Sequence, residues 1–290
     1  MIQASSFRNN LLVVLVGLLL FVPFLGAVHL FDWDEINFAE CAREMLESNN
    51  YLWLQINFKP FCEKPPFFIW LQTLSMKTFG VNEFAARFPN AICGIITLLL
   101  VFKIGEKLFN QRFGILWAAC FVCSILPQLY FKSGIIDPWY NLFIFYSVYR
   151  FYLFIISEKN GNQKIFHLLI SAVSLGLAIL TKGPVAAIIF FICFLIYFIL
   201  KWKIEFRLSH FIIFIFTTSL IGAIWFSILF FTGKKQVLED FLSYQFHLFH
   251  AEDSGHGGPF YYHLLVLLFG CFPASIFAFK ASTVIVFIVM

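Results

Sequence analysis

The residues best suited to chemistry are charged side chains at the borders of long apolar stretches. The first such border reads Phe31-Asp32-Trp33-Asp34-Glu35. Asp32 and Glu35 have the spacing of a helix capping box, and acids at this position suit the positive end of a helix dipole. This structural task leaves Asp34 unused, which makes Asp34 a candidate catalytic carboxylate.

A second charged pair precedes two prolines. Glu63 and Lys64 are followed by Pro65-Pro66 and then by an apolar run. Proline is favoured in the first turn of a helix, so Lys64 is predicted beside free backbone N–H groups, where an anion such as a phosphate binds well. The alternative is that the prolines only set the turn into the helix and that both charges face water.

Two short polar turns each hold one charged residue. Asp137 stands directly before Pro138, and Lys182 stands in the turn 181–184. An acid at a helix start acts as a cap, and a lysine at the end of a span acts as an interfacial anchor. Asp137 is in addition a candidate second carboxylate, because its turn is predicted on the same membrane face as Asp34.

Histidines gather near the C-terminal end. Four of the seven lie within 17 residues, namely His247, His250, His256 and His263. Histidine near acidic residues is typical of zinc sites, but no tight pair such as His-Glu-x-x-His is present, so the spacing gives only a weak metal signal. For His250 and His263, an aromatic belt at head-group depth is the alternative.

The seven cysteines are scattered along the chain. Cys120 and Cys123 lie in an apolar stretch, where they behave as small apolar residues. Cys41 and Cys62 share one polar segment, and they are able to pair if that compartment is oxidising.

The elements that position these residues are predicted to be membrane spans. The 290 residues are 61% hydrophobic, 20% aromatic and 12% charged, whereas about a quarter of a soluble domain is charged. A formal net charge of +4 and 42 phenylalanines argue against nucleic-acid binding and disorder. We therefore predict an all-α, polytopic membrane protein.

Eight apolar stretches are long enough to cross a bilayer, which takes about 20 residues. They lie near 11–31, 85–105, 113–131, 138–157, 165–181, 184–200, 208–232 and 262–279. Pro65–Met76 is too short to cross, and residues 32–47 have a wide apolar face, so both are predicted as interfacial helices.

Charge counting predicts the orientation. With the N-terminus in the cytoplasm, the inner segments hold eleven basic and three acidic residues, and the outer ones hold nine basic and thirteen acidic residues. This bias follows the positive-inside rule. The chain is predicted to be one transmembrane domain, 1–290, truncated at its C-terminus, with outer loops at 32–84 and 233–261. Function is expected on that outer face.

Five stretches in this order resemble one family, the polyprenyl-phosphate-sugar-dependent glycosyltransferases of the protein-mannosyltransferase type. Within it, the bacterial lipid A aminoarabinose transferase-like branch is the most similar. The stretches are DEINFAECAREM from Asp34, FCEKPPFFIWLQ from Phe61, NEFAARFPNA from Asn82, LGLAILTKGP from Leu175 and HGGPFYY from His256.

The resemblance implies an inverting membrane glycosyltransferase. Such an enzyme takes a sugar from a polyprenyl-phosphate carrier and passes it to an acceptor, a lipid A-like glycolipid or a protein, on the extracytoplasmic face of the inner membrane. Nucleic acid is not an expected partner.

The resemblance also implies roles for six residues. They are Asp34 and Asp137 as catalytic carboxylates, Lys64 and Lys182 as donor phosphate ligands, and Glu63 and His256 as a pair that binds zinc or a similar divalent metal. The chain departs from the pattern at Asn37, where relatives often place an arginine near the phosphate.

Two other classes of protein fit the same features. A transporter or flippase of lipid-linked material would use the outer groove without breaking a bond, although its ionisable residues are usually found near the middle of the membrane. A non-catalytic assembly subunit would function only with a second polypeptide.

Overall fold

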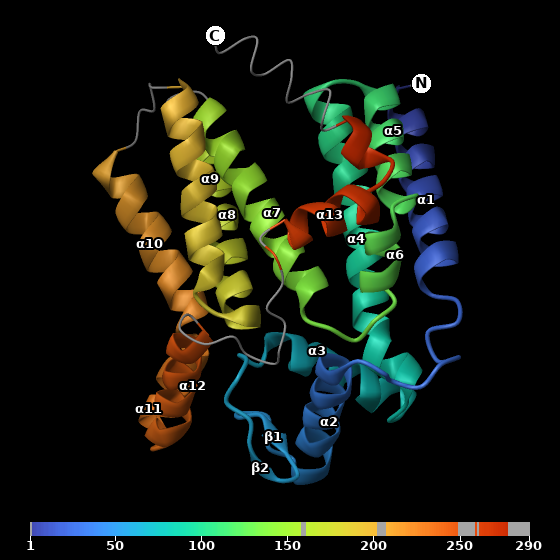
Figure 1. Ribbon diagram of the computed structural model, residues 1–290. Helices are drawn as coiled ribbons and strands as arrows, with labels where there is room; N and C mark the ends of the chain where they lie inside the picture. Colours follow the sequence, from blue (N-terminus) through green and yellow to red (C-terminus); the bar gives the residue numbers. More distant parts are fainter. Residues whose placement is uncertain (1, 158–160, 202–206, 249–258, 260, 278–290) are drawn as a thin grey trace. The chain divides into compact units, whose positions relative to one another are not determined.

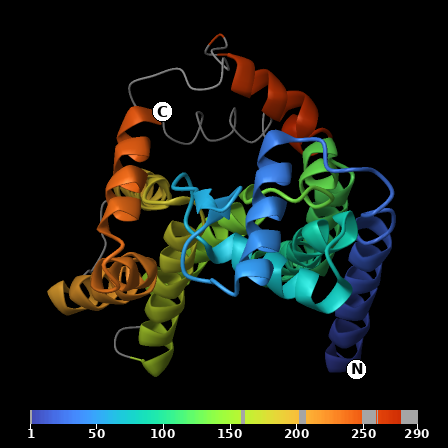
Figure 2. The same ribbon diagram turned by 90° about the horizontal axis from the view of Figure 1, so that it is seen from below.

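A computed structural model describes residues 2–157, 161–201, 207–248, 259 and 261–277. These residues form thirteen α-helices and one short antiparallel hairpin (Figure 1, and turned by 90° in Figure 2). The chain divides into two compact units. The first unit contains residues 1–36, 78–135 and 252–290, and the second contains residues 37–77 and 136–251.

The first unit is built on a long helix, α4, against which α1 and α5 pack (Figure 1). Its helices are α1 (Ile2–Phe21), the start of α2 (Trp33–Ser48), α4 (Glu83–Leu108), α5 (Gln111–Val122), α6 (Ile125–Tyr130) and α13 (Tyr262–Gly270). Glycines allow the helices to approach closely, because a Cβ on Gly105 would lie 2.8 Å from the Cα of Gly114.

The second unit is organised around α8, which contacts α7, α9 and α10. Its elements are most of α2, β1 (Gln55–Ile56), β2 (Lys59–Pro60), α3 (Phe67–Phe79), α7 (Asp137–Ile156), α8 (Asn162–Lys182), α9 (Val185–Lys201), α10 (Leu208–Gly222), α11 (Ile224–Phe231) and α12 (Lys235–Leu248). Aromatic rings fill its core, where Phe151 packs edge-on against Phe190 and Phe214.

Among the residues that the structure describes, three helices are long and apolar enough to cross a membrane, namely α4, α7 and α8. The count rises to four if α10 and α11, which meet at a bend of 54°, are taken as one span. Shorter apolar helices occupy Phe7–Phe21, Gln111–Val122 and Val185–Lys201. The prediction of a mostly helical membrane protein is therefore confirmed.

Several predicted spans are shorter or broken in the structure. The stretch 113–131 divides into α5 and α6 because Pro127 has no N–H and its ring would clash with a continuing helix. In the stretch 11–31, α1 ends at Phe21, two residues before Pro23. Within 262–279, α13 is only nine residues long.

The polar segment 32–84 contains both predicted helices, α2 and α3. It also contains a hairpin, so the all-α prediction was wrong in this detail. The hairpin turns at Asn57 and Phe58, whose φ angles of 53° and 57° suit a type I′ turn. Buried Glu44 stabilises this turn by accepting a hydrogen bond from the Phe58 N–H at 2.9 Å.

Candidate active site

Asp137 and Lys182 meet at one end of the second unit. Asp137 is the first residue of α7 and Lys182 is the last of α8, and the lysine Nζ lies 2.6 Å from Asp137 Oδ1. Each charge suits the dipole of its own helix. Gly183 then ends α8 with a φ of 105°, a conformation that favours glycine. The two side chains thus form an ion pair between two helix ends.

Lys64 lies three residues before the first residue of α3, with Pro65 and Pro66 buried between them. Its side chain is only 13% exposed. The Lys64 Nζ lies 3.9 Å from Glu63 Oε2 and 5.2 Å from the centre of the Tyr244 ring. A lysine held this far from water, at the start of a helix, is well placed to bind an anion.

Gln245 of α12 joins the segments that carry the two lysines. Its Nε2 donates to the Glu63 carbonyl at 3.3 Å. Its Oε1 would lie 3.4 Å from a Cβ on Gly183, the neighbour of Lys182. Gln245 is buried, so it fixes α12 against both segments. The second unit therefore brings Glu63, Lys64, Asp137 and Lys182 to one end.

Gln245 was not singled out from the sequence. Its partner Glu63 is 182 residues away, and no local pattern marks such a contact. The same holds for Trp225, whose indole N–H donates to the Leu52 carbonyl at 2.5 Å.

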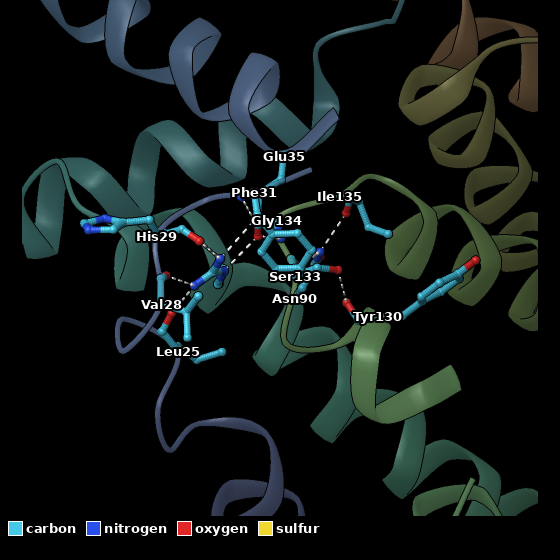
Figure 3. A network of polar contacts seen from close by, with 11 residues as sticks. Leu25, Val28, His29, Phe31, Glu35, Asn90, Tyr130, Ser133, Gly134 and Ile135 are labelled. Carbon is cyan, nitrogen blue, oxygen red and sulfur yellow. Dashed lines mark hydrogen bonds and ion pairs between the residues drawn. The ribbon is translucent and has the colours of Figure 1, made fainter. Parts of the chain in front are cut away.

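Asp34 belongs to the first unit, where it is the second residue of α2 and is half-buried. Its neighbour Glu35 is completely buried. The Glu35 carboxylate accepts hydrogen bonds from Arg87 Nε at 2.8 Å and Arg87 Nη2 at 2.9 Å, from the Gly134 N–H at 2.7 Å and from the Phe31 N–H at 3.3 Å (Figure 3). The interpretation of Glu35 as a capping residue alone was therefore incomplete.

Arg87 is the partner that the sequence analysis missed. Its guanidinium also donates to the carbonyls of Leu25 at 2.7 Å, Val28 at 2.6 Å and His29 at 3.1 Å. One turn along α4, Asn90 Nδ2 donates to the carbonyls of residues 133 and 135, both at 2.6 Å. The available signal was an arginine within the predicted span 85–105, since a charged residue inside a span is rare and is usually paired.

Of the two predicted metal ligands, Glu63 and His256, the structure describes only Glu63. His256 lies outside the described residues, and Glu63 sits beside a lysine. Among the described residues, no group of three His, Cys, Asp or Glu side chains is arranged to hold a metal. The metal therefore stays a prediction, and no chemical step is derived from it.

The two cysteines of the polar segment are free thiols. Burial raises the pKa of Cys62 to about 11, and the charge of Asp240 acts in the same direction. Burial also raises the pKa of Cys41, with further contributions from Glu44 and Glu40. Both thiols are therefore protonated near neutral pH.

These features define a helical membrane protein with half-buried lysines and carboxylates at the ends of its helices. The family described as dolichyl-phosphate-mannose-protein mannosyltransferase matches residues 63–230, more than half of the chain. The chain belongs to this family.

Curated relatives extend the similarity. An undecaprenyl phosphate-alpha-4-amino-4-deoxy-L-arabinose arabinosyl transferase from Wigglesworthia glossinidia brevipalpis is 26% identical over 96% of this chain and 50% of its own length. One from Yersinia enterocolitica is 28% identical over 83% of this chain and 43% of its own length. The chain thus spans about half the length of the curated relatives it matches.

A solved structure has the same fold. The crystal structure of ArnT from Cupriavidus metallidurans bound to undecaprenyl phosphate matches with a TM-score of 0.80 and 20% identity, over 94% of this chain and 50% of that one. The apo crystal structure of the same protein gives a TM-score of 0.79.

Proposed function

We propose that this protein is an inverting glycosyltransferase that moves a sugar from a polyprenyl-phosphate carrier to a glycolipid or protein acceptor. The observation that carries the proposal is the pair of lysine segments joined through Gln245, since Lys64 and Lys182 are suited to a lipid-linked phosphate. Family membership and the names of the relatives, which act on an undecaprenyl-phosphate sugar, support the same assignment.

The reaction breaks the bond between the anomeric carbon and the phosphate oxygen. Polyprenyl phosphate leaves with the electron pair, and the acceptor oxygen bonds to the opposite face of the anomeric carbon. Lys64 and the N-terminus of α3 would stabilise the charge on the leaving phosphate. Asp34 takes the acceptor proton, a step that typically contributes ~10²–10⁴ in rate. Asp137 supports the reaction by holding Lys182.

We further propose that the protein lies in the inner membrane with a cytoplasmic N-terminus and about eight spans. Its active site would then be on the extracytoplasmic face. The charge bias between inner and outer segments supports this orientation. Cysteine labelling from each side of the membrane tests it at position 59 of the hairpin, which is exposed.

Product analysis tests the reaction. The protein in lipid nanodiscs receives undecaprenyl-phosphate aminoarabinose together with envelope glycolipids and proteins as acceptors. A transferase releases undecaprenyl phosphate and forms a glycosylated acceptor, whereas a flippase leaves the donor intact. We expect Asp34→Asn to abolish release, while Asp32→Asn, a change at an exposed acid two residues earlier, leaves it within about twofold. Normal turnover in Asp34→Asn would remove Asp34 from the mechanism.

A further inference from the structure

The Glu35–Arg87 ion pair lies in the first unit, and its hydrogen-bonding groups are used inside the protein and not on a ligand. The Arg87 side chain is 4% exposed and the Glu35 side chain is 0% exposed. Two guanidinium N–H groups donate to Glu35, and the other three donate to the carbonyls of Leu25, Val28 and His29. An arginine has five N–H donors, so all of them are used inside the protein.

Stability alone does not explain why the fold keeps such a pair. Replacing a buried ion pair by apolar residues of similar volume often leaves stability unchanged or raises it, because both charges lose their hydration on burial. What apolar residues cannot replace is a set of directed bonds to backbone groups. Arg87 and Glu35 make five such bonds in total, to two irregular segments and not to other side chains.

These two segments adjoin Asp34 and Asp137, the two carboxylates of the proposed site. The segment 25–31 leads into the first turn of α2, in which Asp34 directly precedes Glu35. The segment 133–135 leads into Asp137 two residues later, and Asn90 holds two of its carbonyls. The backbone on both sides of Asp34, and the backbone just before Asp137, therefore depends on one buried cluster on α4.

We propose that Glu35 and Arg87 are positioning residues for sugar transfer. They fix the backbone that carries Asp34 and leads to Asp137, and they do not touch the substrate. The inference rests on the proposed function, because it assigns the pair to the step in which Asp34 takes the acceptor proton. Moving a catalytic group by about 1 Å lowers the rate of such a step by about 10²-fold.

Steady-state kinetics of three variants test this role. Arg87→Lys keeps the charge but loses the planar fork, and Glu35→Gln keeps the shape but loses the charge. In both, we expect kcat to fall by about 10²-fold and the KM for undecaprenyl-phosphate aminoarabinose to stay within about twofold, since Lys64 is untouched. The third variant, Glu35→Gln/Arg87→Met, removes both buried charges.

The double variant separates positioning from simple stability. Each single variant lowers the unfolding temperature, because it leaves a buried charge with an incomplete partner. We expect the double variant to recover most of that temperature while its kcat stays about 10²-fold low, because the three bonds from Arg87 to the carbonyls of Leu25, Val28 and His29 are still missing. Arg43→Met is the matched control, since it breaks a surface ion pair with Glu40 on the same helix, and we expect unchanged kinetics.

Recovery of kcat together with stability in the double variant would overturn the positioning role. If the wild-type protein transfers no sugar, the proposed function is refuted. The structural part of the inference is then tested by amide hydrogen exchange, which does not depend on activity. Amide hydrogen exchange in residues 25–35 and 133–136 is expected to rise at least about tenfold in Arg87→Lys, with α8 unchanged. Unchanged exchange in both segments would show that Glu35 and Arg87 do not fix this backbone, whatever reaction the protein catalyses.

Discussion

Replacing Lys64 by glutamine tests the proposed phosphate site most directly. A hydrogen bond to a charged group contributes about 1.5–3 kcal/mol, which corresponds to about 10- to 150-fold in affinity. The side chain is only 13% exposed, which strengthens its attraction for an anion. Glu63, 3.9 Å away, opposes part of that attraction. We therefore expect Lys64→Gln to weaken binding of undecaprenyl phosphate by about 10- to 30-fold.

The assay is titration of the protein in nanodiscs with undecaprenyl phosphate, followed by native mass spectrometry. Lys59→Gln is the matched control, because Lys59 is an exposed lysine of the same polar segment. An equal loss of affinity in both variants would show that the effect is general surface charge. An unchanged affinity in Lys64→Gln would refute the phosphate role.

Glu63→Gln adds a test in which the direction of the change in affinity for undecaprenyl phosphate distinguishes two roles of Glu63. If Glu63 mainly repels the phosphate, removing its charge tightens binding of undecaprenyl phosphate. If Glu63 is a metal ligand that supports binding, the same change weakens it and lowers the metal content measured by plasma mass spectrometry. From the 3.9 Å contact with Lys64 we expect tighter binding.

Three further outcomes follow from particular contacts. The pKa of Cys62 is raised from 9.0 to about 11, so less of it is thiolate at pH 8 and it should react with maleimide about 10²-fold more slowly in the native protein than after unfolding. The stability that the protein gains from the neutral thiol is present below pH 9 and is lost as the pH rises through 11. Lys182→Met removes the ion pair with Asp137 and should lower the free energy of unfolding by about 1 kcal/mol in chemical denaturation. The loss is small because the ion pair is partly exposed to water. Gly94→Ala should cost about 1–3 kcal/mol in the same assay, since its Cβ would lie 2.7 Å from the Phe131 ring.

Local patterns predicted the elements that bear the site. The prolines before Phe67 and the apolar face of residues 32–47 correctly indicated α3 and α2. Asp137 and Lys182 were correctly placed at helix ends, because charges border apolar stretches wherever burial at mid-span is costly. The break between α5 and α6 was also predictable, since Pro127 stands inside the predicted span.

Contacts between distant residues were not predictable in this way. Glu35 and Arg87 are 52 residues apart, and Glu35 already had a local explanation as a capping acid. The hairpin at Asn57 lacks the Asn-Gly signal by which type I′ turns are recognised. In both cases tertiary contacts, with Arg87 and with Glu44, decide the local structure.

Charge balance explains why arrangement matters more than the number of lysines in the second unit. Lys64 and Lys182 face two carboxylates, Glu63 and Asp137, so these four side chains carry no net charge. If these side chains bind the carrier phosphate as proposed, the site does not attract anions over a long range, and its affinity depends on short contacts with a phosphate that reaches both lysines. A carrier confined to the bilayer meets this condition, because the membrane already concentrates it. The absence of an arginine at Asn37 is consistent with this design if Lys182, oriented by Asp137, supplies the second cation.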